Sequence, residues 1–141
     1  MIMKIINHET YVSPKVAKLL KEAGFDWEIM SFYTNDITEG CESEYELRLV
    51  KFDNWNSKNK SWCDLVSCPT LDVAQRWLRE VKGYILEITA VRKNPDDVYK
   101  TYIEYWYNIF EEGKCGHYDT YEEAQEAGIK KALEIILEKG E

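Results

Sequence analysis

Four side chains could bind a metal ion if folding brings them together. Cys63 and Cys68 are separated by four residues, and Cys115 and His117 are separated by one. Three thiolates and an imidazole form a ligand set that holds structural zinc in a tetrahedral site. The common zinc motifs use other spacings, and an apolar pair lies between the first two cysteines. The alternative to a small zinc-stabilised module is therefore a set of separate small hydrophobic cysteines and a loop histidine.

Among these four side chains, Cys115 and His117 come closest to the residue types and spacing of a catalytic pair. A nucleophilic cysteine needs a neighbouring base, and Cys115 and His117 lie in a predicted turn, where a separation of one residue is weak support. The other histidine is His8, and no Gly-x-Ser-x-Gly, His-Glu-x-x-His or glycine-rich phosphate loop occurs. The carboxylates at 111–112 and 122–123 adjoin predicted turns and helix starts, where solvation or capping explains them. We therefore expect no enzymatic activity and no cofactor.

Aromatic residues gather on one face of a predicted hairpin. The residues on that face, which alternate with the core-facing series, are Ile85, Val91, Tyr102, Trp106 and Phe110. Trp55 and Trp62 lie in a polar segment, and their side chains are either exposed in the same way or covered by the chain. Because exposed aromatic patches mark partner sites, Tyr102, Trp106, Phe110, Trp55 and Trp62 are the candidate partner-binding residues. The alternative is that another part of the chain covers them.

Helix ends and strand periods define the elements that must position these residues. Cap residues and following glycines predict helices over 13–23, 70–82 and 120–139. Alternation of apolar and polar residues predicts strands over 25–34, 44–49, 86–91 and 99–109. The turn at 94–97 joins the last two strands into a hairpin. The polar stretch over 51–67 has no period, and we interpret it as a long loop.

The resulting order is helix, strand, strand, helix, strand, strand, helix. This order is typical of a single α+β domain over 1–141, in which helices cover antiparallel sheets. Residues 13–52 and 70–110 share the order of an alanine, a Leu-Lys/Arg-Glu triplet and a glycine followed by an aromatic residue, and the second copy needs one extra residue before its glycine. Two similar halves, closed by the helix over 120–139, would explain this. The general pattern of any helix that runs into a strand would explain it as well.

Composition excludes several classes of protein. The chain has 141 residues, a net charge of −8 and 45% apolar residues, which is ordinary for a folded domain. General nucleic-acid binders need clustered Lys and Arg, so we expect no nucleic acid as a partner. No apolar run approaches a membrane span of about 20 residues, and no signal peptide is evident at the start. Together with four cysteines, too few for a disulfide scaffold, this favours a cytoplasmic protein.

Two resemblances bear on function. The run from Tyr121 to Leu133 resembles the last helix of double-stranded-RNA-binding domains, but Glu122, Glu123 and Glu126 stand where those domains carry lysines that grip phosphate. The runs 69–80 (PTLDVAQRWLRE), 120–124 (TYEEA) and 12–25 (VSPKVAKLLKEAGF) together resemble a family of small hypothetical proteins encoded by phages and prophages of gut Bacteroidetes. The second resemblance covers nearly the whole chain and implies a mobile-element origin, but it brings no activity and no functional residue.

The sequence therefore favours a non-catalytic protein-interaction module of phage or prophage origin. One alternative is an acidic mimic of nucleic acid that occupies a host DNA-binding protein, although its carboxylates are mixed with lysines throughout. The other alternative is the zinc-stabilised module. The partner is unknown, and a homodimer through the aromatic strand face is a further possibility.

Overall fold

The computed structural model describes residues 4–6, 9–36, 45–58 and 63–140. Their elements, in chain order, are β1 (Lys4–Ile6), β2 (Glu9–Tyr11), α1 (Pro14–Glu22), β3 (Ile29–Asp36), β4 (Glu46–Asp53), the 3₁₀ turn η2 (Trp55–Ser57), β5 (Cys63–Ser67), α2 (Leu71–Trp77), the π-helical turn η3 (Leu78–Lys82), β6 (Leu86–Lys93), β7 (Tyr102–Ile109), β8 (Gly113–Tyr118) and α3 (Tyr121–Lys139). The predicted α+β class is confirmed.

Each predicted helix begins at its predicted cap. The Ser13 Oγ accepts a hydrogen bond of 3.3 Å from the backbone N–H three residues on, and Thr70 and Thr120 do the same at 3.3 and 3.1 Å. Gly83 and Gly140 follow the second and third helices in the left-handed conformation, with φ of 75° and 72°. These side-chain and glycine caps satisfy backbone groups that a helix leaves without partners at its ends.

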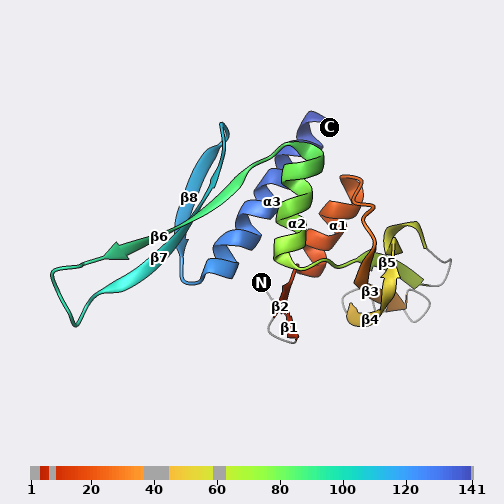
Figure 1. The fold of residues 1–141 in the computed structure, drawn as a ribbon, viewed down its shortest axis with the longest axis horizontal. Coiled ribbons are helices and arrows are strands. Elements are labelled where there is room, and N and C mark those ends of the chain that lie inside the picture. The colour runs from red at the N-terminus through yellow and green to blue at the C-terminus, as the bar shows by residue number, and fades with distance from the viewer. Residues whose placement is uncertain (1–3, 7–8, 37–44, 59–62, 141) are drawn as a thin grey trace.

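The three helices lie side by side between two three-stranded sheets (Figure 1). Sheet β4-β3-β5 lies at the α1 end, and sheet β6-β7-β8 lies against α3. The core between them contains Trp77, Phe25 and Leu133, all with 1% or less of their surface exposed. Burying side chains of this kind stabilises a fold by about 1.5–3 kcal/mol each. The helices therefore form the rigid centre, and each sheet has one face turned toward them.

The first sheet corrects the predicted loop over 51–67. Residues 63–67 form the edge strand β5, which pairs with β3 in the register Tyr33 opposite Val66. Four of its five residues are buried, because η2 covers one face while the core covers the other. A strand buried on both faces shows no period of two, and that is why the alternation test missed it.

The second sheet confirms the predicted hairpin. Strands β6 and β7 are antiparallel from Leu86 opposite Ile109 to Lys93 opposite Tyr102. A third strand, β8, was not predicted and pairs with the other side of β7. It contains two glycines and no β-branched residue, so its composition indicates a turn rather than a strand.

The two predicted halves share a helix followed by a hairpin but differ in sheet order. The third strand adds to β3, the first strand of its hairpin, in one sheet. In the other sheet it adds to β7, the second strand of its hairpin. The described part of the chain has no helix of the length and apolar character needed to cross a membrane.

Candidate functional site

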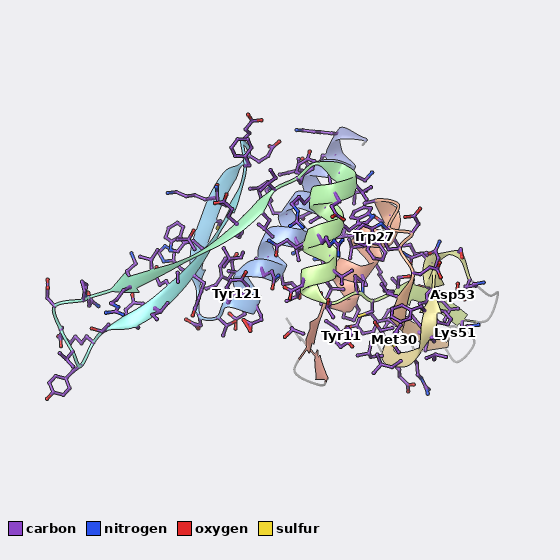
Figure 2. All side chains as sticks on the ribbon, viewed as in Figure 1. Tyr11, Trp27, Met30, Lys51, Asp53 and Tyr121 are labelled. Carbon is purple, nitrogen blue, oxygen red and sulfur yellow. The ribbon has the colours of Figure 1, made fainter. Side chains whose placement is uncertain are left out.

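The sheet β6-β7-β8 turns one face toward α3 and leaves the other open. Leu86, Tyr107 and Ile109 are buried on the helix side, where Gly128 of α3 allows the closest approach. Tyr121, at the start of α3, meets the hairpin on that side, and its ring centroid lies 6.3 Å from that of Tyr105 (Figure 2). No described element lies beyond the sheet on the side away from α3 (Figure 1). We call this open side the outer face.

The outer face carries the aromatic residues that the sequence placed on one side of the hairpin. Tyr102 is 51% exposed and Phe110 is 60% exposed, and Ile85 beside Phe110 is 43% exposed. Trp106 and Val91 are half-buried on the same face. Three of the five candidate partner-binding residues, Tyr102, Trp106 and Phe110, thus occur together on a surface that the described chain does not cover.

Trp106 is held flat against β8 by a glycine. A Cβ built on Gly116 would lie only 1.9 Å from the nearest atom of the Trp106 ring. The register of β7 and β8 shifts at this point, and His117 adopts a positive φ of 76°. This backbone conformation is uncommon for a residue other than glycine. The shift turns the imidazole onto the outer face, with its ring centroid 4.8 Å from that of Trp106.

A single carboxylate joins the polar groups of the outer face. Glu104 is 9% exposed and lies between Tyr102 and Trp106 along β7. Its Oε1 atom is 3.1 Å from His117 Nδ1 and accepts from the Tyr102 hydroxyl at 3.4 Å. Its Oε2 atom accepts from Trp106 Nε1 at 3.2 Å and is 3.7 Å from Lys93 Nζ.

This arrangement stabilises the charged form of Glu104. The hydrogen bond with His117 is the main cause that holds the pKa of Glu104 below its usual value. Partial burial opposes that effect, while the Trp106 indole and the positive charge of Lys93 support it. The carboxylate therefore fixes the orientation of two aromatic rings and an imidazole on a sheet face.

Cys115 and His117, for which the sequence gives only weak support as a catalytic pair, lie on opposite faces of the sheet. Cys115 lies on the helix side of β8, where burial is the main cause that raises the pKa of Tyr107 to about 12 and the nearby thiol adds to it. Burial is also the main cause that raises the pKa of Tyr118, and the same thiol adds to it. His117 lies with Glu104 on the outer face. A carboxylate-backed imidazole can act as a base, but Cys115 cannot serve as its nucleophile across the sheet.

A shallow hollow lies beside Trp106 on the outer face. It has a volume of about 230 Å³ and is lined by Thr89, Val91, Lys93, Trp106, Tyr107, Asn108 and Lys114. Two lysines line it, and no carboxylate among the described residues does so. One of these lysines, Lys93, has its Nζ atom 3.7 Å from Glu104 Oε2, so its charge is partly balanced.

Two of the candidate tryptophans do not join this face. Trp55 is a core residue, with 9% of its surface exposed. Its Nε1 donates to the Ile29 carbonyl at 2.8 Å, and its ring centroid lies 4.4 Å from that of Phe32. The interpretation of Trp55 as an exposed partner residue is therefore wrong, because η2 folds the indole onto β3. Trp62 lies outside the described residues.

The four candidate zinc ligands are separated. Cys63 and Cys68 are buried in and after β5, and the Cys68 Sγ is 3.6 Å from the Val12 carbonyl oxygen. Cys115 and His117 belong to β8, at the other end of the molecule (Figure 1). No group of three or more His, Cys, Asp or Glu side chains that could hold a metal ion occurs among the described residues. The zinc-stabilised module is therefore not supported by the described geometry.

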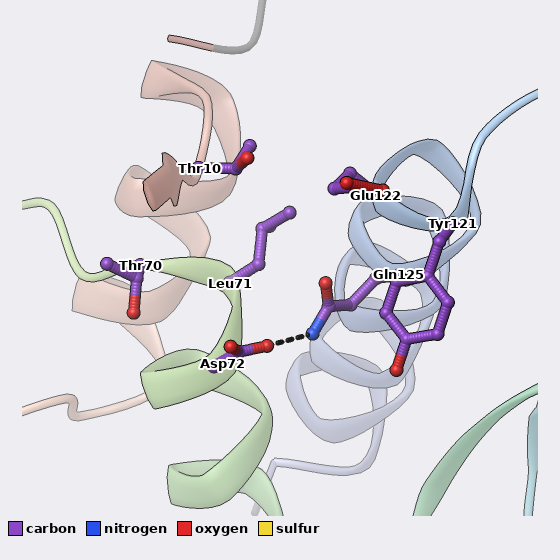
Figure 3. Close-up of a pocket in the computed structure, with 7 residues that line it drawn as sticks. All are labelled: Thr10, Thr70, Leu71, Asp72, Tyr121, Glu122 and Gln125. Carbon is purple, nitrogen blue, oxygen red and sulfur yellow. Dashed lines mark hydrogen bonds between the residues drawn. The ribbon is translucent and has the colours of Figure 1, made fainter. Parts of the chain in front are cut away.

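A second hollow of about 230 Å³ lies between the starts of α2 and α3 (Figure 3). Its polar lining includes Asp72, Glu122 and Gln125. Gln125 Nε2 donates to Asp72 Oδ1 and to Gln75 Oε1, both at 2.8 Å. These bonds connect α3 to α2, and this structural role explains why Asp72 and Gln125 line the hollow.

A third hollow, of about 360 Å³, lies on the first sheet and is more apolar. Its lining includes Met30, Leu49 and Phe52, which are all partly exposed. Figure 2 shows Met30 at this end of the molecule, far from the outer face of the second sheet.

Sequence reasoning missed the polar part of the outer face. Glu104 shares the alternation of Tyr102 and Trp106, so a lone carboxylate between two aromatic residues was the available signal. Lys114 could not be placed, because β8 was interpreted as a turn. Of the glutamates compared with RNA-binding lysines, Glu126 is fully buried and accepts a hydrogen bond of 2.9 Å from the Ser13 N–H. It is therefore a structural residue rather than part of a surface.

Comparison with known proteins adds no further assignment. No protein-family model, curated protein or solved structure matches the chain.

Proposed function

We propose that the protein is a non-catalytic protein-interaction module, of phage or prophage origin, and that it binds its partner through the outer face of sheet β6-β7-β8. One observation carries this proposal: Tyr102 and Phe110 are more than half exposed on a sheet face that no described element covers. Large aromatic side chains supply much of the binding energy of protein interfaces, and a free sheet face leaves them in water.

The organisation around these residues supports the same proposal. Glu104, Gly116 and the positive φ of His117 fix the Trp106 ring in one position. A surface that is already ordered loses less entropy on binding than a flexible one. The outer face therefore combines exposed aromatic side chains with a Trp106 ring that is held in one position.

The test compares two exposed apolar patches in binding to the host proteins. In one variant, Tyr102→Ser and Phe110→Ser remove the two most exposed aromatic side chains of the outer face. In the matched control Val50→Ser and Phe52→Ser remove residues of 58% and 66% exposure on β4. Both variants are expected to fold, because surface substitutions change stability by only about 0.5 kcal/mol.

We expect a protein captured from the host by the wild-type chain to be lost with the first variant and retained with the second. Binding is then repeated with the purified partner to obtain dissociation constants. The proposal is wrong if the β4 variant loses binding and the outer-face variant keeps it. A homodimer is an outcome of the same series, seen by sedimentation as a dimer that only the outer-face variant dissociates.

A further inference from the structure

The loop that joins β6 to β7 presents two apolar side chains to water. Residues 94–101 form this loop, which we call the tip, and Figure 1 shows it at the end of the hairpin, away from the helices. Val98 is 87% exposed and Tyr99 is 98% exposed, the largest values among the exposed large hydrophobic residues of the described chain. Packing within its own chain therefore does not explain this apolar pair.

Hydrogen bonds hold the tip in one conformation. The Asp97 N–H donates to the Asn94 carbonyl at 3.2 Å, and the Lys100 N–H donates to the Asp97 carbonyl at 3.0 Å. Thr101 Oγ1 lies 2.8 and 2.7 Å from those two carbonyl oxygens. The Asp97 carboxylate accepts from the Tyr99 N–H at 3.0 Å. The apolar pair is therefore presented by an ordered loop, which loses less entropy on binding than a flexible one.

The hollow on the first sheet matches the apolar pair in size and character. Its volume is about 360 Å³, and none of its lining residues is charged. A cavity of about 150 Å³ accommodates a benzene ring, so this hollow has room for the Tyr99 ring together with the Val98 side chain. Charged side chains line each of the two hollows of about 230 Å³. The apolar hollow is therefore the better acceptor for the pair.

The tip and the apolar hollow lie at opposite ends of the molecule. Figure 1 shows the tip beyond one sheet, and Figure 2 labels Met30, which lines the hollow, at the end formed by the other sheet. A tip therefore cannot reach the hollow of its own chain, and the hollow of a second copy is the one available to it. Because the two surfaces differ, such a contact leaves a free tip and a free hollow at the ends of each assembly.

The rims of the two surfaces carry opposite charge. The tip has one acidic residue in excess, because its charged residues are Asp96, Asp97 and Lys100. Behind the tip, Lys93 is paired with Glu104, and Arg92 lies on the helix side of β6. Lys51, on β4 beside the hollow, is exposed and forms no ion pair among the described residues. An acidic tip and a hollow beside this lysine attract rather than repel each other.

We infer that copies of this chain associate head to tail, with the apolar pair of one tip inserted into the apolar hollow of the next copy. The inference goes beyond the proposed function, because the contact involves neither Tyr102 nor Phe110 and leaves the outer face open. Stable interfaces bury about 1,200–2,000 Å², and two side chains bury much less. We therefore expect association that depends on concentration, with a dissociation constant of about 0.1–1 mM.

Sedimentation equilibrium of the full chain tests the association directly. We expect the average mass to rise with concentration between about 0.01 and 1 mM. In ¹⁵N-labelled protein, the amide signals of residues 98–99 and of Met30, Leu49 and Phe52 should shift over the same range, while those of β8 stay unchanged. A chain that remains monomeric over this range would overturn the inference.

Three variants locate the contact. The tip variant combines Val98→Ser with Tyr99→Ser, and the hollow variant combines Met30→Ser with Phe52→Ser. The control is Val81→Ser, which changes a residue of 51% exposure on η3, outside both surfaces. Because all these residues are partly or fully exposed, each variant is expected to fold. We expect the tip and hollow variants to weaken self-association about tenfold or more and the control to leave it unchanged. Unchanged association of either double variant would contradict the inference.

A mixture of the tip variant and the hollow variant tests the head-to-tail geometry. Each variant retains the surface that the other lacks, so we expect a one-to-one complex in the mixture and monomers in each separate sample. Absence of that complex would refute the head-to-tail contact. Self-association that is lost with Tyr102→Ser and Phe110→Ser, but kept by the tip variant, would place the contact on the outer face and refute it as well.

Discussion

Replacing Gly116 with alanine is expected to displace the Trp106 ring, which packs directly against this glycine on the outer face. The added Cβ would lie 1.9, 2.2 and 2.4 Å from three atoms of the Trp106 ring. Carbon atoms in contact prefer about 3.5–4.0 Å, so the ring must move by about 1.6 Å or more. The ring cannot do this and keep both its hydrogen bond to Glu104 and its contact with His117.

The expected destabilisation is modest and can be measured. Overpacking of this kind costs about 1–3 kcal/mol. Alanine recovers about 0.4–1 kcal/mol by restricting the unfolded chain, since Gly116 does not have a positive φ. The net loss lies between about 0 and 2.6 kcal/mol, and its midpoint of about 1.3 kcal/mol lowers the melting temperature of a chain of this length by about 3–5 °C.

Urea denaturation of Gly116→Ala, alone and in the Trp106→Leu background, measures this effect. With leucine in place of the ring, Gly116→Ala is expected to cost little, so the two changes show a coupling of about 1 kcal/mol or more. The Trp106 indole N–H signal should also move in the single variant. A cost of Gly116→Ala that is the same in both backgrounds would refute the packing described for the outer face.

Three further predictions concern buried and titrating groups. Burial raises the pKa of Glu126, so the stability that comes from its protonation is present below about pH 4.3, the unfolded value, and is lost as pH rises through the folded pKa. Glu126→Gln should remove that loss of stability in a denaturation series from pH 4 to 8. A pH profile of stability that Glu126→Gln leaves unchanged would contradict the assignment. The pKa of Glu104 is lowered, so the stability that its charged form contributes is present above its unfolded pKa and is lost as pH falls through the folded value. Glu104→Gln should therefore make the acid side of the stability–pH profile flatter. An equally steep acid side would count against the contacts described for Glu104. Trp55→Phe leaves the buried Ile29 carbonyl without its donor and should cost about 1–2 kcal/mol by denaturant midpoint, whereas a neutral effect would place the indole outside the core.

The sequence predicts the elements whose signals are local. The caps at Ser13, Thr70 and Thr120 start the helices where expected, because a side chain that bonds three residues ahead acts within one turn. The hairpin of β6 and β7 is also local, since its alternation and turn lie within one continuous stretch. The same alternation correctly placed Tyr102 and Phe110 on one face.

The missed features depend on contacts distant in sequence. Strand β5 is covered on both faces, so it has no alternation to detect. Strand β8 has the composition of a turn and exists because it pairs with β7. Trp55 lies in a polar segment, and only the fold shows that its indole reaches the Ile29 carbonyl. Glu104 gained its role from partners on β6 and β8 that the sequence could not align with it.

Photo-crosslinking tests the central claim, that the partner binds on the outer face, most directly. The photoreactive residue benzoylphenylalanine is placed at Tyr102, at Phe110 or, as control, at Phe52 on β4, and each chain is irradiated in host cells. We expect the same host protein to be crosslinked from Tyr102 and Phe110 and not from Phe52. A host protein crosslinked from Phe52 alone, with neither outer-face position reacting, would contradict the account.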